Sequence, residues 1–526
     1  MKKSLILLAF WALFTLPATA ASVTIEVRSQ AEFDGLNAAI LTALRSGSEE
    51  ITVQLGEGVY FFSEKHINLN GLSYPGATVI LEGNGAVLIG GGDDLMLRKK
   101  KKGRFTASYA GYDWRRGVID LDRLEDVPPF GALRQAQGPV EILDAGTGLC
   151  RFKAPETAIK APKGMMVQFS SWYQGMTCPV QKIEGGFLYF KVPQLSQSGG
   201  YYNVEGDRQY GGTYPKYQLI NSPEAPLYWD GNRVRAVRKG RYHFCRNSQF
   251  LFVGNCAFKS FELRHFRFLG NSDTAEILFH FHKTKGRLAV AGCTFNGIRN
   301  LILSCADGAS VQFLDNVSEG NYRGTLRADR ESSGVQVLRN IFRNNQLLLN
   351  NTFDVICRGK DLLVKGNTFS DFTYGAIGLG SHFMEDGPAV CSGVVEDNEI
   401  FYTAAYRKEP SRTLMDSGAI YLWTKQNGVT VRNNYIHDYT GSKDNRGIFG
   451  DDGTINATVT GNRILRIGNS YCIDFRRVES VETRSDSKVK KTNIGIKMYD
   501  NTVDGSVRFE PRPGDRTSRK GVNKNL

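Results

Sequence analysis

The chain has 526 residues, of which 57 are glycine and 16 proline, and it carries a formal net charge of +13. A single compact core stops growing at about 250–300 residues, so this length indicates several domains or an elongated repeat. The nine cysteines show no CxxC spacing, which excludes a zinc knuckle and a dense disulfide scaffold. Amphipathic helical stretches are few after residue 50, and this favours the repeat.

Residues 1–20 have the features of an export signal. The basic pair Lys2-Lys3 precedes an apolar run over residues 5–16, and small residues at 18–20 supply a cleavage site. The run is too short to span a bilayer, and no later segment approaches about twenty uninterrupted apolar residues. We therefore expect a periplasmic or secreted protein, cleaved near Ala20, without a transmembrane segment.

Residues 21–95 are expected to form an N-terminal cap and the first coils of a solenoid. Apolar residues at helical spacing over residues 27–50 predict an amphipathic capping helix; they are Phe33, Leu36, Ala39, Ile40 and Leu44. Strand-like segments follow at 56–60, 77–83 and 87–91, each containing glycine. A helix placed there would cover the open end of the stacked strands.

Between residues 96 and 240 the repeat is absent. This stretch contains strand-like segments at 164–169 and 186–192, together with several glycine-rich turns. They predict an inserted β-rich module. Residues 217–225, followed by Leu227-Tyr228-Trp229, resemble a segment of the modules that are inserted in β-helix glycosidases.

Residues 241–510 are expected to form the main parallel β-helix. From residue 290 onward a short motif recurs, in which asparagine or its substitute precedes a strand-like triplet. The shortest intervals are about 23–28 residues, which is typical of solenoid coils. The copies of this motif begin at Cys293, Asn316, Asn340, Asn367, Asn398, Asn434, Asn462 and Asn501. Asparagine tolerates left-handed backbone and can hydrogen-bond its neighbours, so stacked copies predict a ladder.

This combination resembles right-handed parallel β-helix proteins of the pectate-lyase type over roughly residues 245–510. The fold class expected is therefore all-β: a right-handed parallel β-helix with an inserted β-rich module and an N-terminal capping helix. Residues 511–526 are expected to be a basic disordered tail.

The positive charge suits an acidic partner such as a uronate-bearing or sulfated glycan. Much of the excess lies in Arg98–Arg104 and in the tail, where a solvated turn and a disordered end are the alternative explanation. Nucleic acid is not expected as a partner of an exported chain that has no base-stacking module.

In a parallel β-helix, ligands meet the outward face of one sheet and the loops between strands. The intervals from Asn367 to Asn398 and from Asn398 to Asn434 are longer than the basic coil. Their extra residues predict one wall of a groove, with His382 and Glu385 as substrate contacts.

The most specific motif is the segment 416–423, Asp-Ser-Gly-Ala-Ile-Tyr-Leu-Trp. A related segment, 446–453, Arg-Gly-Ile-Phe-Gly-Asp-Asp-Gly, follows one coil later. Stacked strands lie about 4.8 Å apart, so Asp416 and the pair Asp451/Asp452 could face each other. Glycoside hydrolysis needs two carboxyl groups about 5 Å apart for retention and farther apart for inversion. Asp-Gly and Asp-Asp-Gly are also ordinary turn sequences, which is the structural alternative.

These strands resemble β-helix glycosidases such as glycoside hydrolase families 120 and 141. The resemblance implies hydrolysis of a glycosidic bond in a complex polysaccharide, with Asp416 and one of Asp451 and Asp452 as catalytic carboxylates. We favour Asp416 with Asp452. One acid, raised in pKa by a neighbouring charge or by aromatic rings, would protonate the leaving oxygen, and the other would be nucleophile or base.

Other side chains near these motifs are candidate substrate contacts: a turn histidine, aromatic rings that could stack on a sugar, and arginines that could bind a carboxylate or sulfate. They are His437, Trp423, Tyr421, Arg446 and Arg476. We expect no metal and no cofactor for a hydrolase. His280 and His282 point the same way from one strand but have no third ligand for zinc.

Two alternatives stay open from the sequence. A polysaccharide lyase acts on uronates with a Lys or Arg base and often Ca²⁺, and could recruit arginines such as Arg412 or Arg446 and acids such as Asp444. A glycan-binding protein without catalysis would lack two opposed acids. An unsaturated product identifies the lyase, and ligand binding that survives Asp416→Asn identifies the binding protein.

Overall fold

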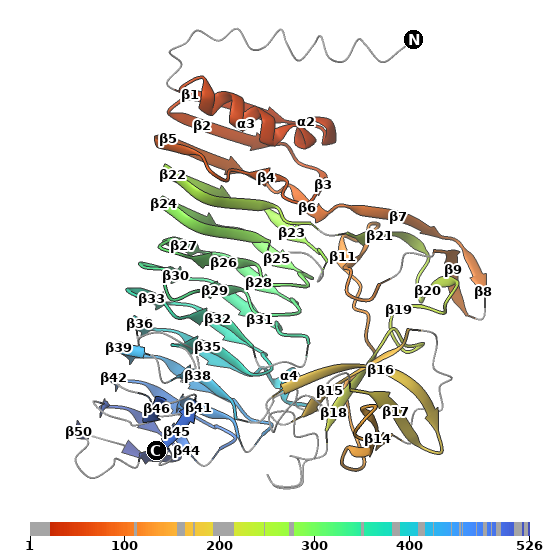
Figure 1. The fold of residues 1–526 in the computed structure, drawn as a ribbon, viewed down its shortest axis with the longest axis vertical. Coiled ribbons are helices and arrows are strands. Elements are labelled where there is room, and N and C mark those ends of the chain that lie inside the picture. Colours follow the sequence, from red (N-terminus) through yellow and green to blue (C-terminus); the bar gives the residue numbers. More distant parts are fainter. Residues whose placement is uncertain are drawn as a thin grey trace.

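The computed structural model describes residues 22–525 with gaps at 102, 110–112, 155–163, 172–173, 193–214, 247, 273–277, 349–351, 381–389, 409–415, 424–425, 443, 452–453, 455, 470, 477–480, 485–486, 491–495, 510–517 and 520–523. Parallel strands stack coil upon coil from the N-terminal cap to the C-terminus, and a second group of strands projects to one side (Figure 1). The predicted fold class, a parallel β-helix with a capping helix and a β-rich insertion, is confirmed.

Each coil contributes to three ladders of parallel strands. The first ladder consists of β4 (Ile67–Asn68), β22 (Leu251–Arg264), β24 (Phe279–Ala291), β26 (Leu303–Ala306), β29 (Leu326–Ala328), β32 (Phe353–Cys357), β35 (Gly375–Leu379), β38 (Gly418–Leu422), β41 (Arg446–Gly450), β44 (Tyr471–Phe475) and β49 (Ser506–Phe509).

The second ladder shares the long strands β22 and β24 with the first. Its other members are β1 (Ser22–Val27), β2 (Glu50–Leu55), β5 (Ser73–Glu82), β27 (Val311–Leu314), β30 (Gln336–Leu338), β33 (Leu362–Lys365), β36 (Cys391–Glu396), β39 (Gln426–Arg432), β42 (Ala457–Thr460), β47 (Lys497–Tyr499) and β50 (Ser518–Arg519).

The third ladder is a separate sheet. It contains β3 (Val59–Phe62), β6 (Val87–Gly90), β23 (Arg267–Leu269), β25 (Thr294–Asn296), β28 (Val317–Glu319), β31 (Ile341–Arg343), β34 (Thr368–Ser370), β37 (Glu399–Phe401), β40 (Tyr435–His437), β43 (Arg463–Leu465), β48 (Thr502–Val503) and β51 (Lys524–Asn525). A hairpin of β45 (Val481–Arg484) and β46 (Ser487–Lys490) stands apart.

Alternation of side chains along each strand builds the core. In the first ladder Ile377, Ile420, Ile448 and Ile473 pair in register on successive coils and are at most 1% exposed. Burial of each such side chain contributes about 1.5–3 kcal/mol. On each strand the residues next to the isoleucine point outward. The register that stacks the isoleucines in the core therefore also aligns the outward side chains of successive coils.

The asparagine repeat forms the predicted ladder inside the turn between the second and third ladders. The backbone N–H of each asparagine donates to the Oδ1 of the next, as from Asn340 to Asn367 at 2.8 Å and from Asn367 to Asn398 at 2.9 Å. The left-handed backbone lies one residue earlier than predicted: Arg339 and Asp397 have φ near 55°. The asparagine itself is the hydrogen-bonding residue of the turn.

We expect Asn367→Ala to lower the free energy of unfolding by about 1–3 kcal/mol. The substitution removes the acceptor of the buried Asn340 N–H and the donor to the Val337 carbonyl. Urea unfolding followed by circular dichroism measures the loss. Asn427→Ala, at an exposed position, serves as the control and should leave stability unchanged.

The predicted capping helix is present as two short helices, α2 (Gln30–Asp34) and α3 (Leu36–Arg45). Ser29 caps α2 by accepting a hydrogen bond from the N–H of Glu32. Phe33, Leu36, Ile40 and Leu44 are buried against the first coil, while Ala39 is only half-buried. The helices therefore cover the end of the solenoid core.

The projecting strands form antiparallel sheets. They are β7 (Gly92–Leu97), β8 (Lys99–Lys101), β9 (Arg104–Ser108), β10 (Val118–Asp120), β11 (Glu125–Asp126), β12 (Arg134–Gln135), β13 (Glu141–Asp144), β14 (Leu149–Lys153), β15 (Met166–Ser171), β16 (Gln174–Glu184), β17 (Phe187–Lys191), β18 (Lys216–Ile220), β19 (Leu227–Trp229), β20 (Arg233–Ala236) and β21 (Gly240–Cys245). The chain leaves the solenoid through β7 and returns through β21, which pair with each other. The predicted domain boundaries stay a prediction.

A buried ion pair joins this module to the solenoid. Arg299 donates to Asp126 of β11 at 3.0 Å, and the Tyr322 hydroxyl donates to the other oxygen of Asp126 at 2.8 Å. The guanidinium of Arg299 lies 3.6 Å from the Tyr322 ring centroid, and Arg299 is 2% exposed. Nearby, Phe130 and Ile220 of the module pack with Tyr322.

All nine cysteines are buried and unpaired. They therefore act as small apolar core residues. Burial raises the pKa of these thiols, to about 12 for Cys245, Cys293 and Cys305.

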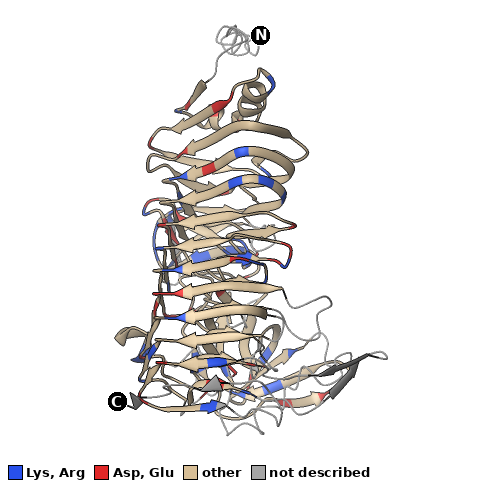
Figure 2. Cartoon of the chain, turned by 90° about the vertical axis from the view of Figure 1, so that its left-hand side faces the viewer, with Lys and Arg blue, Asp and Glu red and all other residues tan. Residues whose placement is uncertain are grey.

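Charged residues of both signs alternate along the turns of the solenoid, as Figure 2 shows for one face. Pairs connect neighbouring coils: Arg339 with Asp315 at 2.7 Å, and Lys365 and Arg432 with Glu396. Arg339 and Asp315 are both exposed, so this pair contributes at most about 1 kcal/mol, whereas the Glu396 side chain is only 9% exposed and is held by two cations.

The second residue of β32 is a fully buried carboxylic acid. Asp354 is 0% exposed, and among the described residues neither of its oxygens has a hydrogen-bond partner of good geometry. Burial raises the pKa of Asp354 to about 8, although the Asn345 and Gln346 amides counteract part of that rise. The side chain is therefore a neutral acid at pH 7.

Because the folded-state pKa of Asp354 exceeds the ordinary value of about 3.9, the folded protein binds more protons than the unfolded chain between these values. Stability should fall as pH rises from about 4 to about 8, by up to about 1.4 kcal/mol per pH unit. Asp354→Asn should remove that slope in urea unfolding across the window. Asp361→Asn, at an exposed turn, should keep it.

Candidate active site

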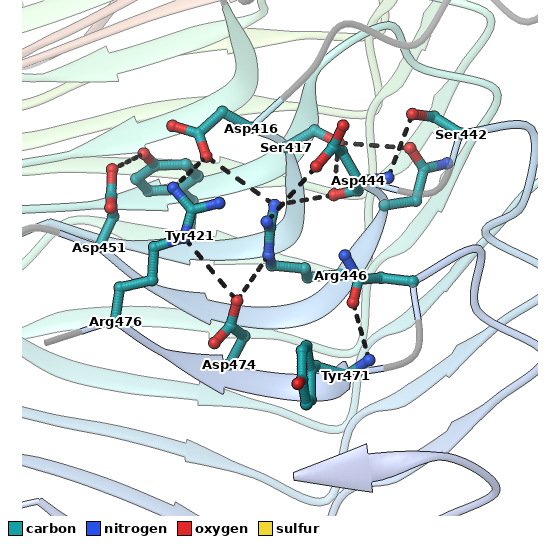
Figure 3. Close-up of polar contacts among 12 residues, drawn as sticks. Asp416, Ser417, Tyr421, Ser442, Asp444, Arg446, Asp451, Tyr471, Asp474 and Arg476 are labelled. Atoms are coloured by element: carbon teal, nitrogen blue, oxygen red, sulfur yellow. Dashed lines mark hydrogen bonds and ion pairs between the residues drawn. The ribbon is translucent and has the colours of Figure 1, made fainter. Parts of the chain in front are cut away.

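The outer face of the first ladder carries the candidate site at the coils of β38, β41 and β44. Tyr421, Phe449 and Asp474 are paired in register on these three strands and point outward, and Arg508 follows on β49. Residues just beyond the strand ends, Asp416, Asp451 and Arg476, surround this column (Figure 3). Three acids, two arginines and two aromatic rings therefore lie together on adjacent coils.

Asp416 lies two residues before β38 in a left-handed conformation with φ of 60°. Aspartate is among the few residues that tolerate this backbone, which turns the carboxylate toward the next coils. Its Oδ1 lies 2.7 Å from Nη1 of Arg476 and 3.9 Å from Nη1 of Arg446. Its side chain is 17% exposed, so two guanidinium groups stabilise a largely enclosed negative charge.

Asp451 lies at the end of β41 and is 9% exposed. The Tyr421 hydroxyl donates to its Oδ2 at 2.5 Å. This bond joins adjacent coils and orients the carboxyl group. Burial, followed by the charge of Asp451, raises the pKa of Tyr421 well above its ordinary value, so the hydroxyl stays protonated and remains a donor.

Aromatic rings enclose the acids. Phe353, Tyr374, Tyr421, Trp423 and Phe449 form one cluster, in which the Tyr421 ring centroid lies 5.0 Å from Trp423 and 4.9 Å from Phe449. Glycine makes this packing possible. A Cβ on Gly378 would lie 3.0 Å from both Phe353 and Trp423, and one on Gly418 would lie 2.7 Å from Phe449.

A third acid, Asp474, is completely buried beneath arginine side chains. Asp474 is 0% exposed and accepts hydrogen bonds from Arg446 Nε at 2.7 Å and from Arg508 Nε and Nη2, both at 2.7 Å. Arg446 also lies 3.6 Å from an oxygen of Asp444. A buried carboxylate needs such paired donors, and the bidentate geometry fixes the guanidinium planes.

Asp416 and Asp451 lie beside Tyr421 and Arg476: the Tyr421 hydroxyl contacts Asp451, and the Arg476 guanidinium contacts Asp416 (Figure 3). After burial, these two charges are the largest causes that raise the pKa of Tyr374 well above its ordinary value. Burial lowers the pKa of Arg476, but Asp416, Asp451 and Asp474 together outweigh it and raise the pKa. One ring and one guanidinium thus lie within the field of both acids.

The structure brings together most of the residues that the sequence singled out. Asp416, Tyr421, Trp423, Arg446, Asp451 and Arg476 lie in this site. His437 does not: it lies on β40 of the third ladder, where it contacts Asp438 and Glu399 and stacks on the rings of Phe401 and Tyr435. Asp452, His382 and Glu385 lie outside the described residues.

Several site residues were not predicted. Tyr374 and Phe353 complete the aromatic cluster, and Arg508 binds Asp474. The sequence does contain one signal for Tyr374. The Gly-Ala-Ile segment that begins at Gly418 also occurs at Gly375, on the preceding coil and directly after Tyr374. No pattern marked Arg508, because its partner Asp474 precedes it by 34 residues.

The arrangement can bind and polarise a sugar. Two carboxylates on adjacent coils can transfer protons or attack, rings can stack on the apolar face of a pyranose, and guanidinium groups can bind anions. Among the described residues no three His, Cys, Asp or Glu side chains are placed to hold a metal ion, and none of the described helices has the length and apolar character needed to cross a bilayer.

A scan against protein-family models finds no match, and a search of curated proteins finds none. Among solved structures, the chain is similar to a protein described as a glycoside hydrolase, with a TM-score of 0.50, 11% identity and 96% of each chain covered. The two chains share the parallel β-helix fold. At this identity the likeness extends to the fold alone, so membership of families 120 or 141 stays a prediction.

Weaker similarities reach two other solved structures. One is the catalytic domain of a GH87 α-1,3-glucanase in complex with nigerose, with a TM-score of 0.31, 9% identity, and coverage of 82% of this chain and 93% of that one. The other is the gp54 tailspike of Acinetobacter baumannii bacteriophage AP22 in complex with a capsular saccharide, with a TM-score of 0.19, 9% identity, and coverage of 93% and 73%.

Proposed function

We propose that the protein is an exported glycoside hydrolase that cleaves a glycosidic bond in a complex polysaccharide with two carboxyl groups, Asp416 and Asp451. The observation that carries the proposal is the meeting of these two acids, from adjacent coils, on one aromatic and arginine-lined part of the outer face. Two opposed carboxyl groups are what glycoside hydrolysis requires.

The surroundings of the two acids suggest different roles. Arg476 and Arg446 stabilise the ionised form of Asp416, which suits a nucleophile or a base that activates water. Asp451 is the less exposed acid, enclosed by rings and held at one oxygen by Tyr421, which suits the proton donor to the leaving oxygen. Asp452, the neighbour favoured from the sequence, is the alternative donor and is tested in parallel.

A polysaccharide lyase is the second candidate, favoured by the arginines that surround the acids. A lyase abstracts the proton next to a uronate carboxylate, and arginine can serve as base or as the group that neutralises the carboxylate. Arg446 is 3% exposed at its side chain, whereas Arg476 is 34% exposed. Arg476 is therefore the more accessible candidate for that role.

The test is an activity assay of the protein on pectic, hemicellulosic and host glycans, with new reducing ends and ultraviolet absorbance measured together. The proposal expects new reducing ends without absorbance from an unsaturated product. Absorbance that rises with the reducing ends would replace the hydrolase with the lyase. Binding of a glycan without either signal would leave a glycan-binding protein.

A further inference from the structure

Three arginines on successive coils differ in what they present to solvent. The side chain of Arg446 on β41 is 3% exposed, whereas those of Arg476, after β44, and Arg508, on β49, are 34% and 32% exposed. The acid between them, Asp474, is 0% exposed. At this end of the site a ligand therefore meets guanidinium groups and not the carboxylate that holds them.

Arg508 is fixed before any ligand arrives. Its Nε and Nη2 donate to the two oxygens of Asp474, both at 2.7 Å, and its guanidinium carbon lies 4.4 Å from the Tyr471 ring centroid. These contacts use one edge and one face of the planar group. Within the described part of the chain Nη1 takes part in neither contact, so it is placed to donate to a ligand. A guanidinium held in this way loses little conformational entropy when it binds an anion.

The pair adjoins the proposed catalytic acids. Arg476 contacts Asp416 at 2.7 Å, and Arg508 lies two coils beyond β41, the strand that Asp451 directly follows. Stacked strands are about 4.8 Å apart, so this separation is about 10 Å along the solenoid. A sugar next to the one being cleaved can reach that distance along the outer face.

We propose that Arg476 and Arg508 form a subsite for an acidic sugar, one that carries a carboxylate or a sulfate, next to the cleavage position. Planar oxyanions accept paired hydrogen bonds from guanidinium groups, and Tyr471 supplies an adjacent ring. The inference names the substrate class of the proposed enzyme and rests on that proposed function for the role of Asp416 and Asp451. The formal charge of +13 is consistent with an anionic glycan.

The test measures binding of monosaccharides, which have no glycosidic bond between sugars to cleave, so its outcome does not depend on hydrolysis. Ligand-observed NMR titration of the full chain compares galacturonate and galactose 6-sulfate with galactose, and glucuronate with glucose. We expect the acidic sugars to bind and the neutral ones to bind at least about tenfold more weakly. The preferred acid distinguishes a carboxylate from a sulfate ligand.

Arg508→Gln should weaken binding of the preferred acidic sugar about tenfold and leave the neutral sugar unchanged, whereas Arg508→Lys should retain part of the preference. Arg466→Gln is the matched control, because Arg466 makes the same two-bond contact with Asp438 on the third ladder. Equal binding of acidic and neutral sugars, or equal loss in the two Gln variants, would overturn the proposal. Thermal melting checks that each variant is folded.

Discussion

Asp416→Asn and Asp451→Asn should each lower kcat for glycan hydrolysis about a thousand-fold while the protein stays folded. A positioned acid or base contributes about 10²–10⁴ to the rate, and asparagine can neither donate the proton nor attack. Asparagine keeps the shape of the side chain and tolerates the left-handed backbone of Asp416. Steady-state kinetics on the best substrate of the glycan panel, with thermal melting alongside, measure the effect.

Asp397→Asn is the matched control for this experiment. Asp397 also has a left-handed backbone, with φ of 56°, but it is exposed and pairs with Lys365 away from the site. Its activity should equal that of the wild type. If Asp452→Asn abolishes activity and Asp451→Asn does not, the proton donor is the neighbouring residue, and unchanged activity in all three site variants would end the assignment.

Asp126→Ala should lower the free energy of unfolding by about 3–5 kcal/mol, because it leaves the guanidinium of Arg299 buried without its carboxylate. The same substitution removes the acceptor of the Tyr322 hydroxyl. Arg299 and Tyr322 lie on the solenoid, whereas Asp126 belongs to the module, so loss of these contacts should also weaken the attachment of the module. Urea unfolding measures the first effect, and limited proteolysis within residues 96–240 measures the second.

Glu125→Ala provides the control on the same strand. Glu125 is 60% exposed and lies 3.7 Å from an exposed arginine, Arg238, so its removal should change stability by less than about 1 kcal/mol. A similar loss in both variants would show that strand β11, and not the buried ion pair, is what the substitution disturbs.

The fold was predictable because its signals repeat along the chain. From Asn316 to Asn501 each coil contains an asparagine, and its side chain accepts the N–H of the corresponding residue on the preceding coil, so the same residue type recurs at each of these turns. The isoleucine columns return with it. What the repeat did not reveal is that the left-handed residue precedes the asparagine, as at Asp397 and Asn433.

Site residues were predictable only where a sequence motif on one coil is followed by a matching motif on the next coil. Asp416 and Tyr421 lie before and within β38, and Arg446 and Asp451 lie at the start of β41 and directly after it, so the stacking of two consecutive coils brings these residues together. His437 occupies an equally suggestive turn, but its strand belongs to the third ladder and faces another direction. Sequence spacing gives the coil of a residue and not the ladder on which it lies.

The arginine contacts could not be foreseen, because they depend on side-chain direction and not on repeat position. Arg446, Arg476 and Arg508 come from three coils, yet all three lie within ion-pair distance of the one buried acid, Asp474. A prediction that considers only pairs of carboxylates on neighbouring coils does not include these arginines.

The central claim, hydrolysis at Asp416 and Asp451, is tested most directly by the products formed in water labelled with heavy oxygen. We expect each cleavage to add one water to the products, with one labelled oxygen detected by mass spectrometry at the new reducing end. The Asp416→Asn variant should form no cleavage products. Products that lack the elements of water and carry no label would contradict the account and establish an eliminating lyase in its place.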